Sequence, residues 1–193
     1  LCLLGTPVGL GYFGYQLAAG QNDDSLVFNQ QSAENWQKEL ALQALQLEQL
    51  RSVLVGCIEA PYNFMRAVVP NLISQGSGQV LVITSASAAR PTPGAPLYSA
   101  ARAGASMLVK NVADEIARTG VQVNAVGTNF MDFPGFLAAS GANDPEVRAK
   151  IEAQVPMRRL GTMSEFAAFC MVFLDGSSQF TTGQFVAYAG GWA

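Results

Sequence analysis

The chain has 193 residues, of which half are hydrophobic and 13% are charged, so it can form one sizeable core and does not require a second domain. Its formal net charge of -3 and its isoelectric point near 4.9 give no electrostatic reason to expect a nucleic-acid partner. No apolar run reaches the roughly 20 residues that span a bilayer, and the first residues lack the basic start and cleavage site of a signal peptide. We therefore expect a soluble cytoplasmic protein without a membrane partner.

Certain residue types are absent or widely spaced, which limits the possible chemistry. Histidine is missing, which excludes a His-based triad and most zinc sites. The three cysteines, Cys2, Cys57 and Cys170, have no C-x-x-C spacing and are expected to be reduced core residues. We predict no metal site, and any acid–base chemistry must use carboxylates, Tyr, Lys or Cys.

The first quarter of the chain holds two short patterns. Gly5, Gly9 and Gly11 in GTPVGLG have the G-x3-G-x-G spacing of a phosphate-binding loop at the start of a helix. DSLVFNQ, residues 24–30, can be a strand, either the second or the fourth of a nucleotide-binding fold. So short a glycine pattern is weak evidence for a phosphate-binding loop, and the role of the three glycines stays open at this point.

From residue 47 onward, helix and strand signals alternate. Residues 47–74 predict a long helix that Pro61 kinks, and QVLVIT, residues 79–84, follows a turn-rich QGSG as a buried parallel strand does. A helix over 99–118 is expected to end at Gly120. The remaining expected elements are a strand at 121–126, helices at 145–154 and 164–175, and a strand at 184–189. This order predicts an α/β fold with a doubly wound parallel sheet in a single domain, residues 1–193.

Tyr98 and Arg102 stand four positions apart near the start of one expected helix, thirteen residues after Ser85 at a strand end. A neutral phenol is a poor base at pH 7, and a cation one helical turn away favours its deprotonated form. The pair alone could equally be a ring stacked under a guanidinium on a wet helix face, and Ser85 alone could cap its own turn. The three residues together indicate a proton-transfer site.

The pattern S-x12-Y-x3-R, formed by Ser85, Tyr98 and Arg102, resembles the active site of the short-chain dehydrogenase/reductase superfamily. That superfamily normally has lysine where Arg102 stands. The arginine form resembles the halohydrin dehalogenases, cofactor-free relatives on the same Rossmann-like fold. The resemblance implies that Tyr98 is the general base, that Arg102 acts electrostatically and that Ser85 holds the substrate oxygen.

The stretch VNAVGTNFMDFPGF, residues 123–136, is similar to the loop that forms a halide site in halohydrin dehalogenases and fills the nicotinamide space of the dehydrogenases. VPMRRLG, residues 155–161, and GQFVAYAGGWA, residues 183–193, are also similar to that family. The resemblance implies a halide and substrate site at six residues of this loop: Thr128, Asn129, Phe130, Met131, Pro134 and Phe136.

The resemblance implies a cofactor-independent lyase that converts vicinal haloalcohols to epoxides and halide, and that opens epoxides with small anionic nucleophiles. It also implies a homotetramer and a Rossmann-like fold. The residues before Ser85 are too few for two further β/α units of that fold, so either the N-terminal half is shortened or the sequence is part of a longer chain. No bound cofactor is expected.

Two alternatives stay open. One is an NAD(P)-dependent short-chain oxidoreductase in which GTPVGLG binds the cofactor. The other is a non-catalytic binding protein on the same scaffold.

Overall fold

The computed structural model describes residues 37, 38, 40, 41 and 47–193. The glycine pattern at 5–11 and the possible strand at 24–30 lie outside the described residues. The chain divides into two units, Leu1–Gln46 and Leu47–Ala193, and every sheet and cavity described below belongs to the second.

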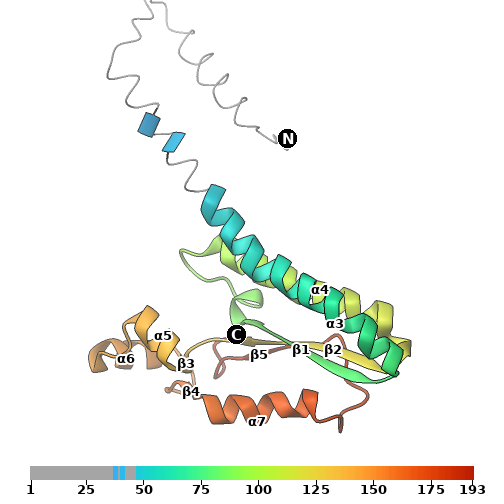
Figure 1. Cartoon of the computed structure of the whole chain (residues 1–193). Helices are drawn as coiled ribbons and strands as arrows, with labels where there is room; N and C mark the ends of the chain where they lie inside the picture. Colours follow the sequence, from blue (N-terminus) through green and yellow to red (C-terminus); the bar gives the residue numbers. More distant parts are fainter. Residues whose placement is uncertain (1–36, 39, 42–46) are drawn as a thin grey trace, which may run out of the picture. The chain divides into compact units, whose positions relative to one another are not determined.

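A parallel sheet forms the centre of this unit (Figure 1). Its strands are β1 (Gly78–Ser85), β2 (Val121–Thr128) and β5 (Phe185–Tyr188), in the order β1-β2-β5. Residues 121–127 of the middle strand are all buried, as expected for a strand covered on both faces. The three predicted strands are confirmed, with ends that differ by no more than two residues.

Helices cover both faces of the sheet, which confirms the doubly wound architecture. Residues 47–54 are helical and continue into the π-helix η1 (Val55–Glu59) and then α3 (Ala60–Gln75). The π-helix ends two residues before Pro61, whose missing N–H interrupts regular α-helical bonding. Helix α4 (Pro96–Ile116) lies beside α3 on one face, and α7 (Met163–Leu174) covers the other (Figure 1).

The ends of α4 follow from local sequence. Pro96 opens the helix at a position where its missing N–H is not needed. After α4 the short η3 (Ala117–Thr119) leads to Gly120, whose φ of 81° is a left-handed conformation that glycine adopts without strain. The prediction that Gly120 closes this helix is confirmed.

The short elements lie near the carboxyl ends of the strands. They are η2 (Ala86–Ala88), β3 (Met131–Asp132), α5 (Pro134–Ser140), α6 (Pro145–Glu152) and β4 (Gly161–Thr162), and β3 pairs with β4 in parallel. Helix α6 was expected, whereas α5 and the β3–β4 pair were not, because they are too short to show a periodic pattern.

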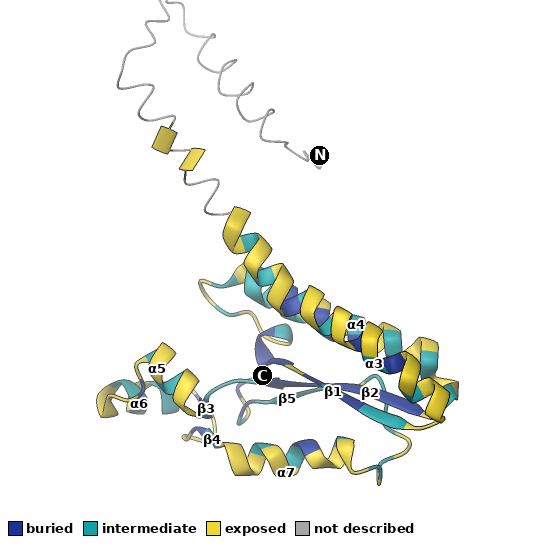
Figure 2. Ribbon diagram, in the orientation of Figure 1, coloured by how far each residue is buried: buried dark blue, intermediate teal, exposed yellow. Residues whose placement is uncertain are grey.

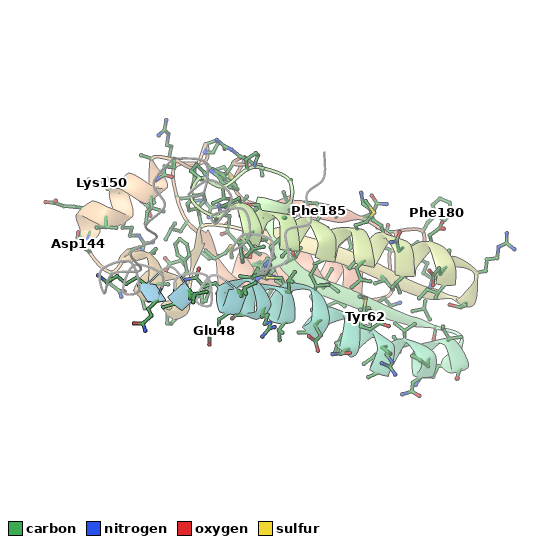
Figure 3. The ribbon with its side chains drawn as sticks, turned by 90° about the horizontal axis from the view of Figure 1, so that it is seen from above. Glu48, Tyr62, Asp144, Lys150, Phe180 and Phe185 are labelled. Carbon is green, nitrogen blue, oxygen red and sulfur yellow. The ribbon has the colours of Figure 1, made fainter. Side chains whose placement is uncertain are left out.

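The core lies between the sheet and the helices α3 and α4 (Figure 2). Met65 and Val69 of α3 and Val109 of α4 pack against valines of β1 and β2. The outer helix surfaces keep large apolar residues: Tyr62 and Phe64 on α3 are 47% and 54% exposed, and the labelled Tyr62 lies on this surface in Figure 3. In the part of the chain that the structure describes, no helix is both long and apolar enough to cross a membrane.

Candidate active site

A cavity of about 820 Å³ opens at the carboxyl edge of the sheet, beyond the ends of β1 and β2. This edge is where ligands bind in open α/β sheets. The walls come from the loop between β1 and α4, the first turn of α4, the loop after β2, the start of α5 and the C-terminus. The lining residues are Ser85, Ser87, Arg90, Pro91, Thr92, Pro93, Ala95, Tyr98, Thr128, Asn129, Phe130, Met131, Phe133, Phe136, Gln154 and Trp192.

Ser85 ends β1 and is only 6% exposed. Its hydroxyl oxygen accepts a hydrogen bond from the backbone N–H of Ser87 at 3.2 Å, so the hydroxyl does cap its own turn. A serine hydroxyl has two acceptor positions and one proton, and this bond uses an acceptor position. The Ser85 proton is therefore available for donation to a ligand in the cavity.

Tyr98 lies in the first turn of α4 and lines the cavity, with Arg102 one turn further along. The central guanidinium carbon of Arg102 lies 4.9 Å from the centre of the Tyr98 ring, in a cation–π arrangement. Arg102 is not among the residues that line the cavity, and its Nε is buried without a hydrogen-bond partner among the described residues. The Arg102 guanidinium thus lies over the Tyr98 ring without lining the cavity.

The loop after β2 places Thr128, Asn129, Phe130 and Met131 on the cavity wall. Phe130 has a φ of 54°, a left-handed conformation that costs a non-glycine residue about 1–2 kcal/mol. Its N–H is bonded to the Asn129 side-chain oxygen at 3.0 Å, and the N–H of Asn129 donates to the Tyr188 carbonyl at 3.4 Å. Two backbone N–H groups of the expected halide site are therefore already occupied, whereas the Asn129 side-chain NH2 has no partner among the described residues.

Aromatic rings form one side of the cavity. Phe130 packs edge-on against Phe136, with ring centres 6.3 Å apart, and against Trp192 at 5.5 Å. Phe133 packs against Phe136 at 6.5 Å. Pro134 differs from the prediction: it is the exposed first residue of α5 and does not line the cavity.

Several lining residues were not singled out from the sequence, among them Arg90, Phe133, Gln154 and Trp192. The contact between Arg90 and Trp192 joins residues 102 positions apart, so no local spacing predicts it. Phe133 lies within residues 123–136, the stretch that resembles the halide-site loop. Its place in sequence near Phe136 was the one signal that could have indicated it as a site residue.

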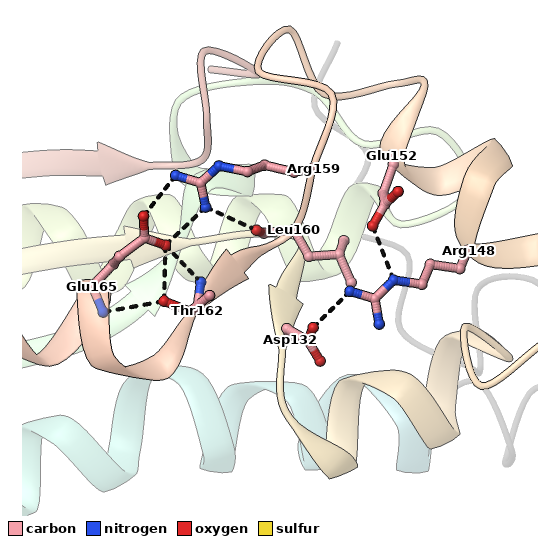
Figure 4. A network of polar contacts seen from close by, with 7 residues as sticks. All are labelled: Asp132, Arg148, Glu152, Arg159, Leu160, Thr162 and Glu165. Carbon is pink, nitrogen blue, oxygen red and sulfur yellow. Dashed lines mark hydrogen bonds and ion pairs between the residues drawn. The ribbon is translucent and has the colours of Figure 1, made fainter. Parts of the chain in front are cut away.

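An ion-pair network holds the end of the β2 loop (Figure 4). Arg148 of α6 donates to Asp132 of β3 at 2.6 Å and to Glu152 at 2.9 Å. These carboxylates raise the pKa of the Arg148 guanidinium, with the Asp132 hydrogen bond as the first cause. The network ties α6 to β3, directly after the cavity residue Met131.

A second network fixes β4 and the start of α7 (Figure 4). Thr162 and Glu165 form a capping box, and Arg159 pairs with Glu165 at 2.7 Å. The Arg159 hydrogen bond, followed by those from Thr162, lowers the pKa of Glu165 to about 2. Because Gly161 N–H donates to the Phe130 carbonyl at 3.0 Å, this anchored segment supports the strained Phe130.

Comparison with known protein families gives one broad match. A family model described as Enoyl-(Acyl carrier protein) reductase matches residues 24–193. The chain is 27% identical over 156 residues to the 3-oxoacyl-[acyl-carrier-protein] reductase FabG of Staphylococcus epidermidis, covering 80% of this chain and 62% of the reductase. It is 25% identical to the 2-(R)-hydroxypropyl-CoM dehydrogenase of Xanthobacter autotrophicus, covering 84% of this chain and 58% of the dehydrogenase.

Two solved structures are similar to this chain in both fold and sequence. A protein described as "Dehalogenation enzyme" is 34% identical with a TM-score of 0.67, covering 76% of this chain and 60% of that one. The TT0495 protein from Thermus thermophilus is 28% identical with a TM-score of 0.68, covering 77% and 63%. This chain thus spans about three fifths of the length of these relatives.

Proposed function

Because this chain belongs to the short-chain dehydrogenase/reductase superfamily, we propose that it is a cofactor-independent halohydrin dehalogenase. The observation that carries the proposal is the arrangement of three residues: Ser85 and Tyr98 face one cavity, and the guanidinium of Arg102 lies against the Tyr98 ring outside that cavity. The 34% identity to the structure described as a dehalogenation enzyme supports it.

The proposed reaction needs no electron carrier. Tyr98, as general base, takes the hydroxyl proton of a vicinal haloalcohol, and the Ser85 hydroxyl donates a hydrogen bond to the same oxygen. The oxygen attacks the neighbouring carbon, the carbon–halogen bond breaks with its electron pair, and the products are an epoxide, a halide ion and one proton. Arginine suits the supporting role because it keeps its positive charge throughout.

The leaving halide needs a weakly hydrated place with few but directed donors. The side-chain NH2 of Asn129 is such a donor, and Asn129 lines the same cavity as Phe130 and Phe136. Ring edges carry partial positive charge, so edge-on aromatic groups suit a large anion. In this proposal, side chains bind the halide, and the backbone N–H groups of the loop after β2 do not.

The experiment that tests this function uses Tyr98→Phe with 2-bromo-1-phenylethanol and measures bromide release. Loss of a general base lowers the rate by about 10² to 10⁴. Tyr62→Phe is the matched control, because Tyr62 is an exposed phenol on α3 away from the cavity. Circular dichroism checks that both variants fold. Wild-type turnover by Tyr98→Phe would contradict the mechanism.

A second candidate function is an NAD(P)-dependent oxidoreductase, which the names of the curated relatives favour. The described residues do not fit that cofactor well, because Arg102 stacks on Tyr98 and offers no donor to a ribose inside the cavity. Ultraviolet absorbance and native mass spectrometry after mild purification decide between the two. A bound nicotinamide nucleotide would favour the oxidoreductase.

A further inference from the structure

Arg90 is the only formally charged side chain among the described residues that line the cavity. No Asp, Glu or Lys of the described chain shares that wall, and the nearby Arg102 is also a cation. The proposed reaction uses Ser85, Tyr98 and Asn129 and leaves Arg90 without a role. A lone cation in an otherwise uncharged cavity favours ligands that carry a negative charge.

The Arg90 guanidinium is held in place although the residue is exposed. It lies 4.7 Å from the centre of the Trp192 ring and donates through one Nη to the Trp192 carbonyl at 2.5 Å. Trp192 itself is buried, only 8% exposed, against Ala86 and Ala189. Of the five guanidinium N–H donors, only this one is bonded to a described residue, so the remaining donors can reach a ligand.

We propose that Arg90 binds a carboxylate on the non-reacting end of the substrate, so that the preferred haloalcohols and epoxides are acids. This inference rests on the proposed function. The planar guanidinium fork matches the two oxygens of a carboxylate better than it matches a single halide ion. The rings of Phe130, Phe133 and Phe136 line the same cavity as Arg90 and provide an apolar wall for the body of the substrate.

The test compares two epoxides of equal shape, 4-(oxiran-2-yl)benzoate and 4-(oxiran-2-yl)benzamide, both opened by azide. The wild type should favour the benzoate by about tenfold in kcat/KM, since the charged contact is partly screened by water. Arg90→Gln should remove most of this preference, and Arg90→Lys should keep part of it. The preference should also weaken with rising salt.

Arg118→Gln is the matched control, because Arg118 is exposed in η3, at the amino edge of the sheet opposite the cavity. It should keep the wild-type preference. An Arg90→Gln variant with the full benzoate preference would overturn the proposal. So would an equal rise in the KM for azide with both epoxides, because that result would assign Arg90 to the nucleophile.

Binding without turnover separates this inference from the proposed function. The chain has two tryptophans, so Trp36→Phe leaves Trp192 as the fluorescent reporter in the cavity. 4-Ethylbenzoate should bind about tenfold more tightly than 4-ethylbenzamide, and Arg90→Gln should lose the difference. If neither epoxide is opened but this difference is seen, the dehalogenase function fails while the Arg90 site stands. Equal binding of the two compounds to the wild type would refute the site.

Discussion

Gly127→Ala tests whether the close approach of β1 and β2 sets the position of Ser85. Gly127 pairs in register with Thr84, directly before Ser85. A Cβ at position 127 would lie 2.7 Å from the carbonyl carbon and oxygen of Ser85 and 2.7 Å from Cζ of Phe185. Carbon atoms in contact prefer about 3.5–4.0 Å, so the Ser85 backbone would have to move by roughly 1 Å.

Two measurable losses follow from that displacement. Overpacking of this kind lowers the free energy of unfolding by about 1–3 kcal/mol, which urea denaturation measures. A shift of about 1 Å in a group that holds the substrate lowers turnover by about 100-fold, which bromide release measures. The stability loss does not depend on what the protein catalyses.

Gly56→Ala is the matched control for this experiment. Gly56 lies in the helical segment η1, and a Cβ there meets nothing within 4 Å. Alanine is a better helix former than glycine by up to about 1 kcal/mol, so this variant should be as stable as the wild type or more stable. If Gly127→Ala keeps both wild-type stability and wild-type turnover, the steric argument at Ser85 is wrong.

Three further outcomes are expected. Arg102→Lys should keep part of the activity because it keeps the charge, whereas Arg102→Gln should lose most turnover; wild-type turnover by Arg102→Gln would mean that Arg102 only packs on the ring. The hydrogen bonds from Arg159 and Thr162 hold the pKa of Glu165 at about 2, below its ordinary 4.5, so their stabilisation is present above about pH 4.5 and is lost as the pH falls toward 2. The difference in thermal stability between wild type and Glu165→Gln should shrink over that range, and a constant difference would count against the charge effect. The resemblance to the halohydrin dehalogenases implies a homotetramer, for which the exposed apolar faces of α3 and α4, including Phe64 and Met107, offer contact surface; light scattering that gives a monomer at micromolar concentration would contradict it.

The predicted elements that the structure confirms are those with long or strongly apolar patterns. The helix beginning at residue 47, the helix with Tyr98 and the three strands each carry a period or a β-branched run that local sequence makes visible. The short α5 and the β3–β4 pair have too few residues for a period. The β3–β4 pair also has a contact from another segment, because Arg148 of α6 pairs with Asp132 of β3.

The same distinction holds for the candidate site. The spacing of Ser85, Tyr98 and Arg102 follows from one strand, one turn and one helix in succession, so the sequence by itself determined that the three lie near one another. Only the tertiary structure decided that Arg102 lies behind the Tyr98 ring rather than in the cavity, and that Pro134 lies outside the cavity wall. Only the tertiary structure brought Arg90 and Trp192 to the cavity wall, because a contact between segments 102 residues apart depends on how the whole sheet and its loops pack.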